Sequence, residues 1–515
     1  MRRLMQLSAL VVLATACLPV APAAALYFPV TNTEDSGNET LRWAIEEAND
    51  HEGPDTIPIE ATGTIDLEEV LPMVSGDVEI TGPGADELTV RRSAEAAFRI
   101  FHFGDGVTAS LEGVTVTDGV EAIVGGGILN DNGSLTLTGV IVTGNEVTDG
   151  GVLPIVHGGG IASYGPLTVR ESVIEGNTAI AQGGTTTVAE GGGISSLSAL
   201  TVDRSTISEN VAQALGTGGT QVSAHGGGIR AVGDSATIER STVSGNSATA
   251  TEGANLVVAS GGGIQGVGVT LTSSTVTGNE ISSEKTAAGA NLDISGTTLV
   301  RNTIVSAALG DAESCSGPET SGGFNLDEDG SCEFGQSTDM DGVVAGIDPL
   351  LKDNGGPTPT HELLSGSPAI DRGNSFGSAI DQRGLPRPSD FASIGNAEGG
   401  DGSDIGAFEL QAPAPTPVLV TTTPADTHPP NTRIVFAPPR VTYKRLAKFR
   451  FASTERQSTF QCKVDQGRWR GCRNPCKRRV SAGAKHVFKV RAVDRFGNVD
   501  PTPARFGWRV KEIGD

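Results

Sequence analysis

The feature that most constrains the fold is a tetrapeptide, Gly-Gly-Gly-Ile, that returns five times at almost constant intervals. Its copies begin at residues 125, 158, 191, 226 and 261, so the intervals are 33, 33, 35 and 35 residues. A fixed period of this length is typical of a solenoid, in which each repeat buries its hydrophobic face only against its neighbours. We therefore expect stacked, similar layers rather than one globular core.

Two short alternating runs follow each tetrapeptide and indicate β-strands. In one repeat they are Leu200-Thr-Val-Asp203 and Ser205-Thr-Ile-Ser208. Alternation turns the aliphatic side chains to one face and the polar ones to the other. Aromatic residues make up only 4% of the chain and Gly accounts for 70 residues, which suits narrow rungs. Because parallel crossovers are right-handed, the sequence predicts an all-β protein whose body is a right-handed parallel β-helix.

An asparagine ends the second run of each repeat. Asn tolerates left-handed backbone, and amides stacked at one turn can form hydrogen bonds along the axis. We therefore predict a structural ladder of Asn145, Asn177, Asn210, Asn246, Asn279 and Asn302. The last interval, 23 residues, is interpreted as a bare rung. The longer intervals are interpreted as a rung plus an inserted loop, with all the loops on one side of the solenoid.

This pairing of a Gly-rich element with a downstream Asn, over about residues 104–302, resembles the repeats of polymorphic outer-membrane proteins. Those proteins are surface adhesins, so the resemblance implies an extracellular body that makes contacts with surfaces. Only the passenger-type body is matched, because nothing in this sequence resembles their C-terminal membrane barrel.

The N-terminus has the form of an export signal. Arg2 and Arg3 precede a mostly apolar stretch over residues 7–18, and Ala23-Ala24-Ala25 offers a cleavage site. We expect residues 1–25 to be a signal peptide and the protein to be secreted, extracellular or on the cell surface. Lipidation at Cys17 is an alternative. No later apolar stretch reaches the length of a membrane span, so no transmembrane segment is expected.

Both ends of a solenoid need caps, because an open end exposes strand edges and apolar side chains. At the start, residues 26–55 are expected to form an N-terminal cap with a short helix near residues 40–49, whose apolar stripe is Leu41, Ala44, Ile45 and Ala48. The segment resembles the head of secreted bacterial β-helix proteins, with Trp43 in place of their usual acid. The β-helix itself is expected over residues 56–310.

Residues 311–411 carry a different set of motifs. They read Asp348-Pro-Leu-Leu, Gly366-Ser-Pro-Ala-Ile-Asp371, Asp381-Gln-Arg-Gly-Leu-Pro-Arg387 and Asp404-Ile-Gly-Ala-Phe-Glu409. This set resembles the choice-of-anchor Q region of such β-helix proteins, and we expect it to form the C-terminal cap. Cys315 and Cys332 precede these motifs, and their 17-residue separation suits one disulfide.

A Pro/Thr-rich linker over residues 412–430 leads to a small domain at residues 431–515. Its runs Lys448-Phe-Arg-Phe and Phe506-Gly-Trp-Arg-Val predict a β-sandwich. Residues 458–508 resemble bacterial Ig-like modules, in which a Cys pair staples a hairpin. The resemblance implies a disulfide between Cys462 and Cys472, with Cys476 as a competitor for Cys472.

The net charge of −24 is divided unevenly along the chain. Residues 424–515 contain 21 Lys+Arg and 7 Asp+Glu, a net of +14, and the rest contains 16 against 54, a net of −38. An acidic body repels nucleic acid, so no nucleic-acid partner is expected. The basic C-terminal domain is suited to contact with an anionic surface polymer or with the acidic body itself.

A polysaccharide lyase or glycoside hydrolase needs clustered carboxylates and a base. His157 and His225 precede a Gly triplet at the same phase, which can bring them to one face two rungs apart. They are weighed as metal or acid/base candidates but interpreted as exposed turn residues. We therefore predict no catalytic, cofactor-binding or metal-binding residue.

The preferred function is non-catalytic adhesion or binding to a cell-wall or extracellular polysaccharide. The alternatives are a lyase or hydrolase of uronate polymers and a structural spacer of the cell envelope. The sequence leaves the oligomeric state open.

Overall fold

The computed structural model describes residues 24–233, 235–251, 255–316, 319–412 and 426–512. All but the last two residues of the predicted signal peptide, and most of the predicted linker, lie outside these ranges. The chain divides into two compact units, residues 1–413 and 414–515, and each is described by itself. Among the described residues, no helix is long and apolar enough to cross a membrane.

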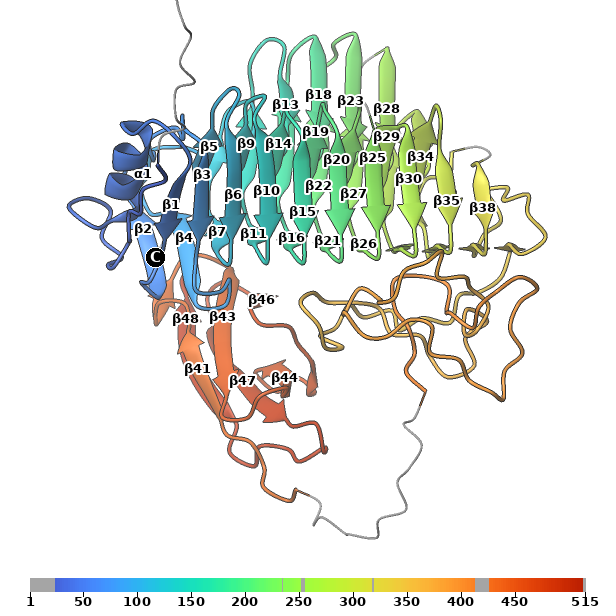
Figure 1. Ribbon diagram of the computed structural model, residues 1–515. Helices are drawn as coiled ribbons and strands as arrows, with labels where there is room; N and C mark the ends of the chain where they lie inside the picture. The colour runs from blue at the N-terminus through green and yellow to red at the C-terminus, as the bar shows by residue number, and fades with distance from the viewer. Residues whose placement is uncertain (1–23, 234, 252–254, 317–318, 413–425, 513–515) are drawn as a thin grey trace, which may run out of the picture. The chain divides into compact units, whose positions relative to one another are not determined.

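The N-terminal unit is a parallel β-helix whose rungs contribute strands to as many as five stacked sheets (Figure 1). We number the sheets in the order in which the chain passes through a rung, starting after the Gly triplet. The first three form the main body. Sheet 1 contains β5 (Phe101–Phe103), β9 (Ile128–Asn130), β14 (Ile161–Ser163), β19 (Ile194–Ser196), β24 (Ile229–Ala231), β29 (Ile264–Val267) and β34 (Leu292–Ser295). Sheet 2 contains β1 (Asp55–Pro58), β3 (Val78–Thr81), β6 (Thr108–Glu112), β10 (Ser134–Thr138), β15 (Leu167–Arg170), β20 (Leu200–Asp203), β25 (Ala236–Glu239), β30 (Val269–Thr272), β35 (Leu299–Arg301) and β38 (Ser321–Gly323). Sheet 3 contains β2 (Gly63–Leu67), β4 (Leu88–Arg92), β7 (Thr115–Thr117), β11 (Ile141–Thr143), β16 (Val173–Glu175), β21 (Thr206–Ser208), β26 (Thr242–Ser244), β31 (Thr275–Thr277), β36 (Ile304–Ser306), β39 (Leu326–Asp327) and β40 (Met340–Asp341).

The predicted inserted loops are strands, which corrects the sequence-based expectation. They build two further parallel sheets that we call the fin, and β13, β18, β23 and β28 project beyond the rest of the body in Figure 1. Sheet 4 contains β8 (Val120–Glu121), β12 (Glu146–Asp149), β17 (Thr178–Gln182), β22 (Val211–Leu215), β27 (Ser247–Thr251), β32 (Glu280–Ser283) and β37 (Leu309–Gly310). Sheet 5 contains β13 (Ile155–His157), β18 (Thr186–Glu190), β23 (Gln221–His225), β28 (Leu256–Ser260) and β33 (Thr286–Ala288).

The fin has a hydrophobic core of its own, separate from the aliphatic core of sheets 1 to 3. Most of its buried side chains are alanines, such as Ala214 and Ala224 on facing sheets. Small side chains allow the two sheets to pack closely, and the alternation of Ala with Gln, Thr or Ser leaves the outer faces polar.

The fin joins the body at a neck in which the Gly triplets meet the asparagines. The third Gly of each triplet lies against the Asn of its own repeat: a Cβ on Gly193 would come within 2.9 Å of Asn210 Cγ and 2.7 Å of Gly228 O. The Asn210 side chain accepts hydrogen bonds from the Asn177 backbone N–H and the Asn177 amide, at 3.0 and 2.9 Å. The same pattern links Asn145, Asn177, Asn210, Asn246 and Asn279 in order.

Asn302 does not continue this ladder, which corrects the prediction. The Asn279 amide donates to Asn291 Oδ1 at 2.9 Å, and Asn291 occupies the third position of a degenerate triplet, Gly289-Ala290-Asn291. Asn302 instead lies in the turn between β35 and β36, where it donates to Ser273 Oγ. The 23-residue interval therefore joins two different turns, since Thr275 of β31 pairs with Ile304 of β36, 29 positions later.

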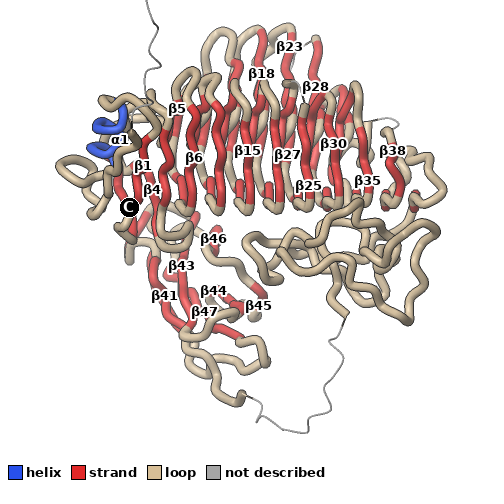
Figure 2. Tube along the Cα trace, in the orientation of Figure 1, coloured by secondary structure: helices blue, strands red, loops and turns tan. Residues whose placement is uncertain are grey.

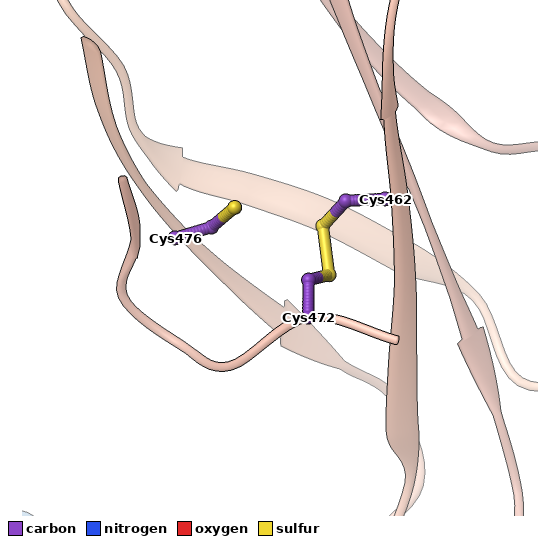
Figure 3. Close-up of side chains that lie close together, drawn as sticks. All are labelled: Cys462, Cys472 and Cys476. Atoms are coloured by element: carbon purple, nitrogen blue, oxygen red, sulfur yellow. A yellow bond between two sulfur atoms is a disulfide. The ribbon is translucent and has the colours of Figure 1, made fainter. Parts of the chain in front are cut away.

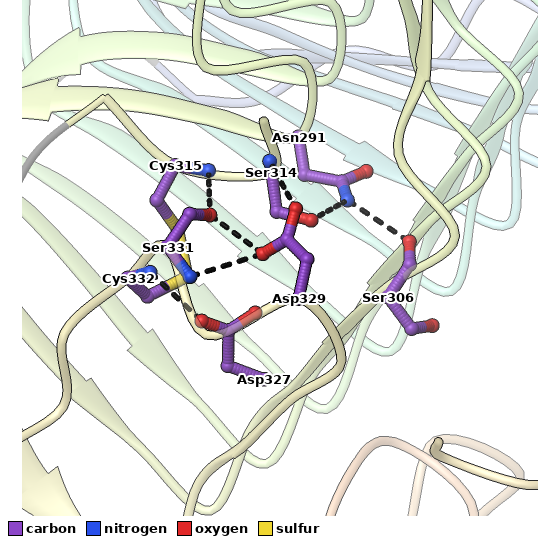
Figure 4. Close-up of a disulfide and its surroundings, with 8 residues drawn as sticks. All are labelled: Asn291, Ser306, Ser314, Cys315, Asp327, Asp329, Ser331 and Cys332. Atoms are coloured by element: carbon purple, nitrogen blue, oxygen red, sulfur yellow. Dashed lines mark hydrogen bonds between the residues drawn. A yellow bond between two sulfur atoms is a disulfide. The ribbon is translucent and has the colours of Figure 1, made fainter. Parts of the chain in front are cut away.

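Different devices close the two ends of the body. At the start, α1 (Leu41–Asn49) begins after the N-cap Thr40 and buries the predicted stripe of Leu41, Ala44, Ile45 and Ala48. At the other end, the predicted Cys315–Cys332 disulfide is present and its sulfurs belong to the aliphatic core. Figure 4 shows the surrounding network, in which Asp329 accepts hydrogen bonds from the backbone N–H groups of Ser314 and Ser331.

Residues 343–412 form loops rather than strands (Figure 2) and lie over the outer face of sheet 3 instead of the end of the solenoid. Side chains of sheet 3 anchor them: Thr242 Oγ1 donates to Gln382 Oε1 at 2.6 Å, and Ser244 Oγ lies 2.8 Å from His361 Nε2. The expected C-terminal cap is thus two pieces, an end piece with the disulfide and a lateral cover.

The charged motif residues of the lateral cover are paired inside it. Arg387 and Glu409 form a fully buried ion pair at 2.8 Å, and Arg383 pairs with Asp381 at 2.7 Å. Burial and the neighbouring Glu409 raise the pKa of Asp404 to about 7. Most polar atoms of these groups pair with one another or with backbone N–H groups, although Arg387 Nη1 has no partner among the described residues, and this pairing indicates a structural role for the motifs.

The C-terminal unit is a two-sheet sandwich around a core that includes Phe449, Phe488 and Trp508. One sheet contains β41 (Thr432–Phe436), β43 (Leu446–Ser453) and β46 (Cys476–Arg479). The other contains β42 (Val441–Thr442), β48 (Ala504–Val510), β47 (Lys485–Val493), β44 (Thr459–Val464) and β45 (Arg470–Gly471). The predicted Cys462–Cys472 disulfide is present, and Cys476 is free and buried beside it (Figure 3).

Candidate functional site

A row of aligned side chains runs along the face of sheet 1 that is turned away from the core. The first residue of each strand points into the core, as Ile194 and Ile229 do, so the second residue points to the opposite face, where some members of the row are exposed in part and others, such as Ser195, are buried. Parallel register aligns these second residues from rung to rung. We call them the sheet-1 row: His102, Leu129, Ala162, Ser195, Arg230, Gln265 and Asp293.

A second row lies beside it on the fin. The last residues of the strands of sheet 5 are in register, and they form the sheet-5 row of His157, Glu190, His225, Ser260 and Ala288. His157 and His225 are thus two rungs apart on one face, with Glu190 between them. Their interpretation as exposed turn residues is wrong, because both are half-buried ends of strands.

Glu190 connects the two rows. Its carboxylate lies 3.1 Å from His157 Nδ1 and 3.6 Å from Arg230 Nε of the sheet-1 row. Burial alone would raise the pKa of Glu190, but the hydrogen bond with His157 and the charge of Arg230 outweigh it and lower that pKa. Burial, followed by the charge of Arg230, also lowers the pKa of His225, so this imidazole is neutral at neutral pH.

Further ionisable groups extend the rows towards the N-terminal end. Arg99 pairs with Glu121 at 2.8 Å, and His102 Nε2 lies 4.0 Å from Asp131. Burial and the charge of Arg99 lower the pKa of His102. Burial and the charge of Asp131 raise the pKa of Tyr164. This end therefore presents donors, acceptors and one phenol ring on the same face.

At the C-terminal end the rows approach Glu319. This carboxyl group is 6% exposed, and burial raises its pKa to about 8. The charge of Asp293, from the sheet-1 row, raises it further. Glu319 is therefore protonated at neutral pH and presents both a donor and an acceptor.

Buried polar atoms without a hydrogen-bond partner among the described residues gather along these rows. Seven of the thirteen such atoms lie there: Arg99 Nη1, His102 Nε2, Ser195 Oγ, Arg230 Nε and Nη1, Gln265 Oε1 and Glu319 Oε2. Buried polar groups are nearly always hydrogen-bonded, so this concentration is unusual and makes the face the candidate site. We call the two rows together with Arg99, Tyr164 and Glu319 the polar face.

Two other groups bring possible metal ligands together in the described residues. Cys462, Cys472 and Cys476 have sulfurs within 4.8 Å of one another, but two of these form the disulfide. Oxygens of Asp426, Glu455 and Asp494 are equally close. Asp494 already accepts hydrogen bonds from Phe496 and Asn498, so neither group is preferred as a site.

The sequence reasoning found the phase of His157 and His225 but missed the sheet-1 row. The signal was the residue after each Gly-Gly-Gly-Ile, which changes from Leu129 through Ala162 and Ser195 to Arg230 and Gln265. The residues around this position repeat strictly, whereas the position itself varies and becomes more polar along the chain. Such a position is typical of a side chain that points away from the core.

Comparisons with known proteins complete the description. No family model matches the chain, and no curated protein matches it. Among solved structures it is similar to pectate lyase Pel9A, at 14% identity and a TM-score of 0.33, over 75% of this chain and 96% of that one. It is also similar to the A-module of the mannuronan C-5 epimerase AlgE6 of Azotobacter vinelandii, at 11% identity and a TM-score of 0.23, over 57% and 97% of the two chains. Similarity this distant carries no information about activity.

Proposed function

We propose that the protein is an exported, surface-associated polysaccharide-binding protein that holds its ligand, without cleaving it, along the polar face. The observation that supports this most is the series of unpartnered buried polar atoms on that face. They include donors, such as those of Arg230, and acceptors, such as Gln265 Oε1. Sugar hydroxyls donate and accept at once, so a carbohydrate satisfies both kinds.

The length and regularity of the face favour a polymer over a small ligand. The sheet-1 row contains seven residues on adjacent strands, and six spacings of about 4.8 Å give about 29 Å. Polar side chains recur along the row, although not at every rung, since Leu129 and Ala162 are apolar. Arg230 Nε lies 3.6 Å from the Glu190 carboxylate, and Arg230 Nη1 has no hydrogen-bond partner among the described residues. We expect this donor to bind a carboxylate of an acidic polysaccharide.

Glycan-array binding of the full chain tests this proposal, with neutral oligosaccharides and galacturonate and mannuronate oligomers displayed. Arg230→Met is expected to lose at least about tenfold in affinity, because a charged hydrogen bond is worth about 1.5–3 kcal/mol. The matched control is Arg170→Met, an exposed arginine of sheet 2, which should bind as the wild type does. If no glycan is retained, the proposal is refuted, and the alternative function of a structural spacer of the cell envelope is favoured.

A lyase is the second candidate, because one observation favours it. The neutral His225 imidazole lies near Arg230, and β-elimination needs a base near a cation that neutralises the sugar carboxylate. Incubation with polygalacturonate and polymannuronate should then release unsaturated ends, and His225→Gln should stop the release. Binding without any new ends would exclude this activity on these polymers.

We further propose that the basic C-terminal unit helps to retain the protein on an anionic surface polymer. Its support is the net charge of +14 over residues 424–515. Attraction of this kind weakens as the Debye length falls from about 10 Å at 0.1 M salt. Release of the full chain from isolated cell walls by salt, but not by neutral sugars, is the expected result, and salt-resistant retention would contradict it.

A further inference from the structure

The C-terminal unit contains a pocket that is rich in cationic side chains. It has a volume of about 380 Å³ and lies between β44, the β44–β45 hairpin, β46 and the start of β47. Its lining includes Lys463, Arg468, Arg470, Arg478 and Arg479, with Asp465 as the one carboxylate.

Among the described residues of the C-terminal unit, none of these five cations forms an ion pair. Asp465 is engaged by another lining residue, because it lies 2.8 Å from His486 Nδ1, and it also accepts a hydrogen bond from the Val487 N–H at 2.7 Å. Five like charges around one hollow repel one another, and a bound anion relieves that repulsion.

We propose that this pocket is an oxyanion-binding site that takes one carboxylate, sulfate or phosphate group of an anionic glycopolymer. The inference rests on the proposed retention by the C-terminal unit and gives it a specific site. Four of the five cations are arginines, whose planar forks bind oxyanions with two hydrogen bonds at once. The volume is within the range of ordinary ligand sites, which suits one anionic unit with its sugar.

Trp469 favours a glycopolymer over nucleic acid as the source of the anion. Lys463 Nζ and Arg491 Cζ lie 4.9 and 4.4 Å from the centre of its ring. Single-stranded nucleic acid binds on free aromatic platforms, whereas this ring is engaged by two cations. Lys463 of the lining is thus held against Trp469, and the pocket itself offers charge without a free aromatic ring for stacking.

Two charge-matched double variants of the full chain test the site. Arg468→Gln with Arg478→Gln removes two lining charges, and Arg433→Gln with Arg495→Gln removes two exposed charges outside the pocket. Affinities are measured for oligogalacturonate, a sulfated oligosaccharide, poly(glycerol phosphate) and a DNA duplex. All variants also carry Arg230→Met, so that binding of a probe at the polar face does not mask a loss of binding at the pocket.

We expect one-to-one binding of at least one glycopolymer, a loss of about tenfold or more in the pocket pair, and less than about threefold in the control pair. The preferred probe identifies which oxyanion is bound. Equal losses in both pairs would show diffuse charge attraction and overturn the site. Tightest binding to DNA, or binding to none of the probes, would overturn it as well.

A third pocket variant, which keeps the charge, controls for misfolding of the Gln variant. Arg468→Lys with Arg478→Lys retains both cations but loses the planar forks, and we expect an intermediate loss. Unchanged affinity in this pair, with a normal melting temperature, would contradict recognition by the arginine geometry.

Discussion

At the scale of single residues, the neck explains why Gly-Gly-Gly-Ile and Asn recur together. The sequence alone predicted a ladder for the asparagines, but their direct contact with the glycines depends on the fin, which periodicity does not show. The prediction for Asn302 was wrong because Asn302 also follows an aliphatic run, as the ladder asparagines do. It lies in the turn before sheet 3, whereas the ladder asparagines lie in the turn after sheet 3.

The contact at the neck predicts that Gly193→Ala is destabilising. The new Cβ would lie 2.7 Å from Gly228 O and 2.9 Å from Asn210 Cγ. Either the backbone at Gly228 or the asparagine ladder must therefore move. We expect a loss of about 1–3 kcal/mol in the free energy of unfolding, measured by urea denaturation. Gly395→Ala is the control, because its Cβ would meet nothing within 4 Å, and an equal loss there would contradict the account.

The ladder predicts a larger effect for Asn210→Ala. This change removes the acceptor of two Asn177 donors and the donor to Ile174 O and Asn246 Oδ1. Because these groups are buried, we expect a loss of about 3 kcal/mol. The exposed Asn38→Ala should change stability by less than about 0.5 kcal/mol. Similar denaturation midpoints for the two variants would show that the ladder adds little.

Glu319 predicts a specific dependence of stability on pH. The folded chain keeps its proton to about pH 8, whereas an unfolded Glu releases it near pH 4.3. The folded state therefore binds more protons in this window, and stability falls as the pH rises through it. Glu319→Gln removes this loss, so its stability relative to the wild type should rise by at least about 1 kcal/mol between pH 5 and pH 8.5. A constant difference in unfolding free energy would contradict a protonated Glu319.

At the scale of elements, the main strands were predictable because alternation and the repeat point to the same rungs. The fin was not predicted, although its signal was present. The segments Val211–Leu215 and Ser247–Thr251 alternate alanine with other residues. Alanine is a weak strand former in isolation, and only the stacking of equivalent segments in register gives it a core to fill.

The close packing of the fin predicts opposite outcomes at neighbouring positions of β22. Ala214→Leu should destabilise the protein by about 1–3 kcal/mol, because its side chain is fully buried between the sheets and extra volume forces them apart. Gln213→Leu points to the other face and should change stability little. Thermal melting of both variants checks this, and a tolerated Ala214→Leu would mean that the fin is loosely packed.

At the scale of the whole N-terminal unit, the outer faces differ in what covers them. The lateral cover occupies sheet 3 with mostly paired groups, since only Arg387 Nη1 and Ser403 Oγ among its buried polar side-chain atoms lack a partner in the described part of the chain, while the polar face of sheet 1 and sheet 5 retains seven unpartnered atoms. Sequence could not predict this difference, since residues 343–412 pack on strands more than a hundred positions earlier in the chain. The candidate site follows from that contrast and from the fin beside it.

Covalent footprinting of the full chain, with and without the acidic oligosaccharide that the glycan array selects, tests the polar face most directly. The account predicts protection of peptides that contain β18, β23 and β24, where Glu190, His225 and Arg230 lie. Peptides with the outer threonines of sheet 2, such as Thr201, should stay unchanged. Protection of sheet 2 instead, or of neither sheet while the ligand is bound, would contradict the assignment of binding to the polar face.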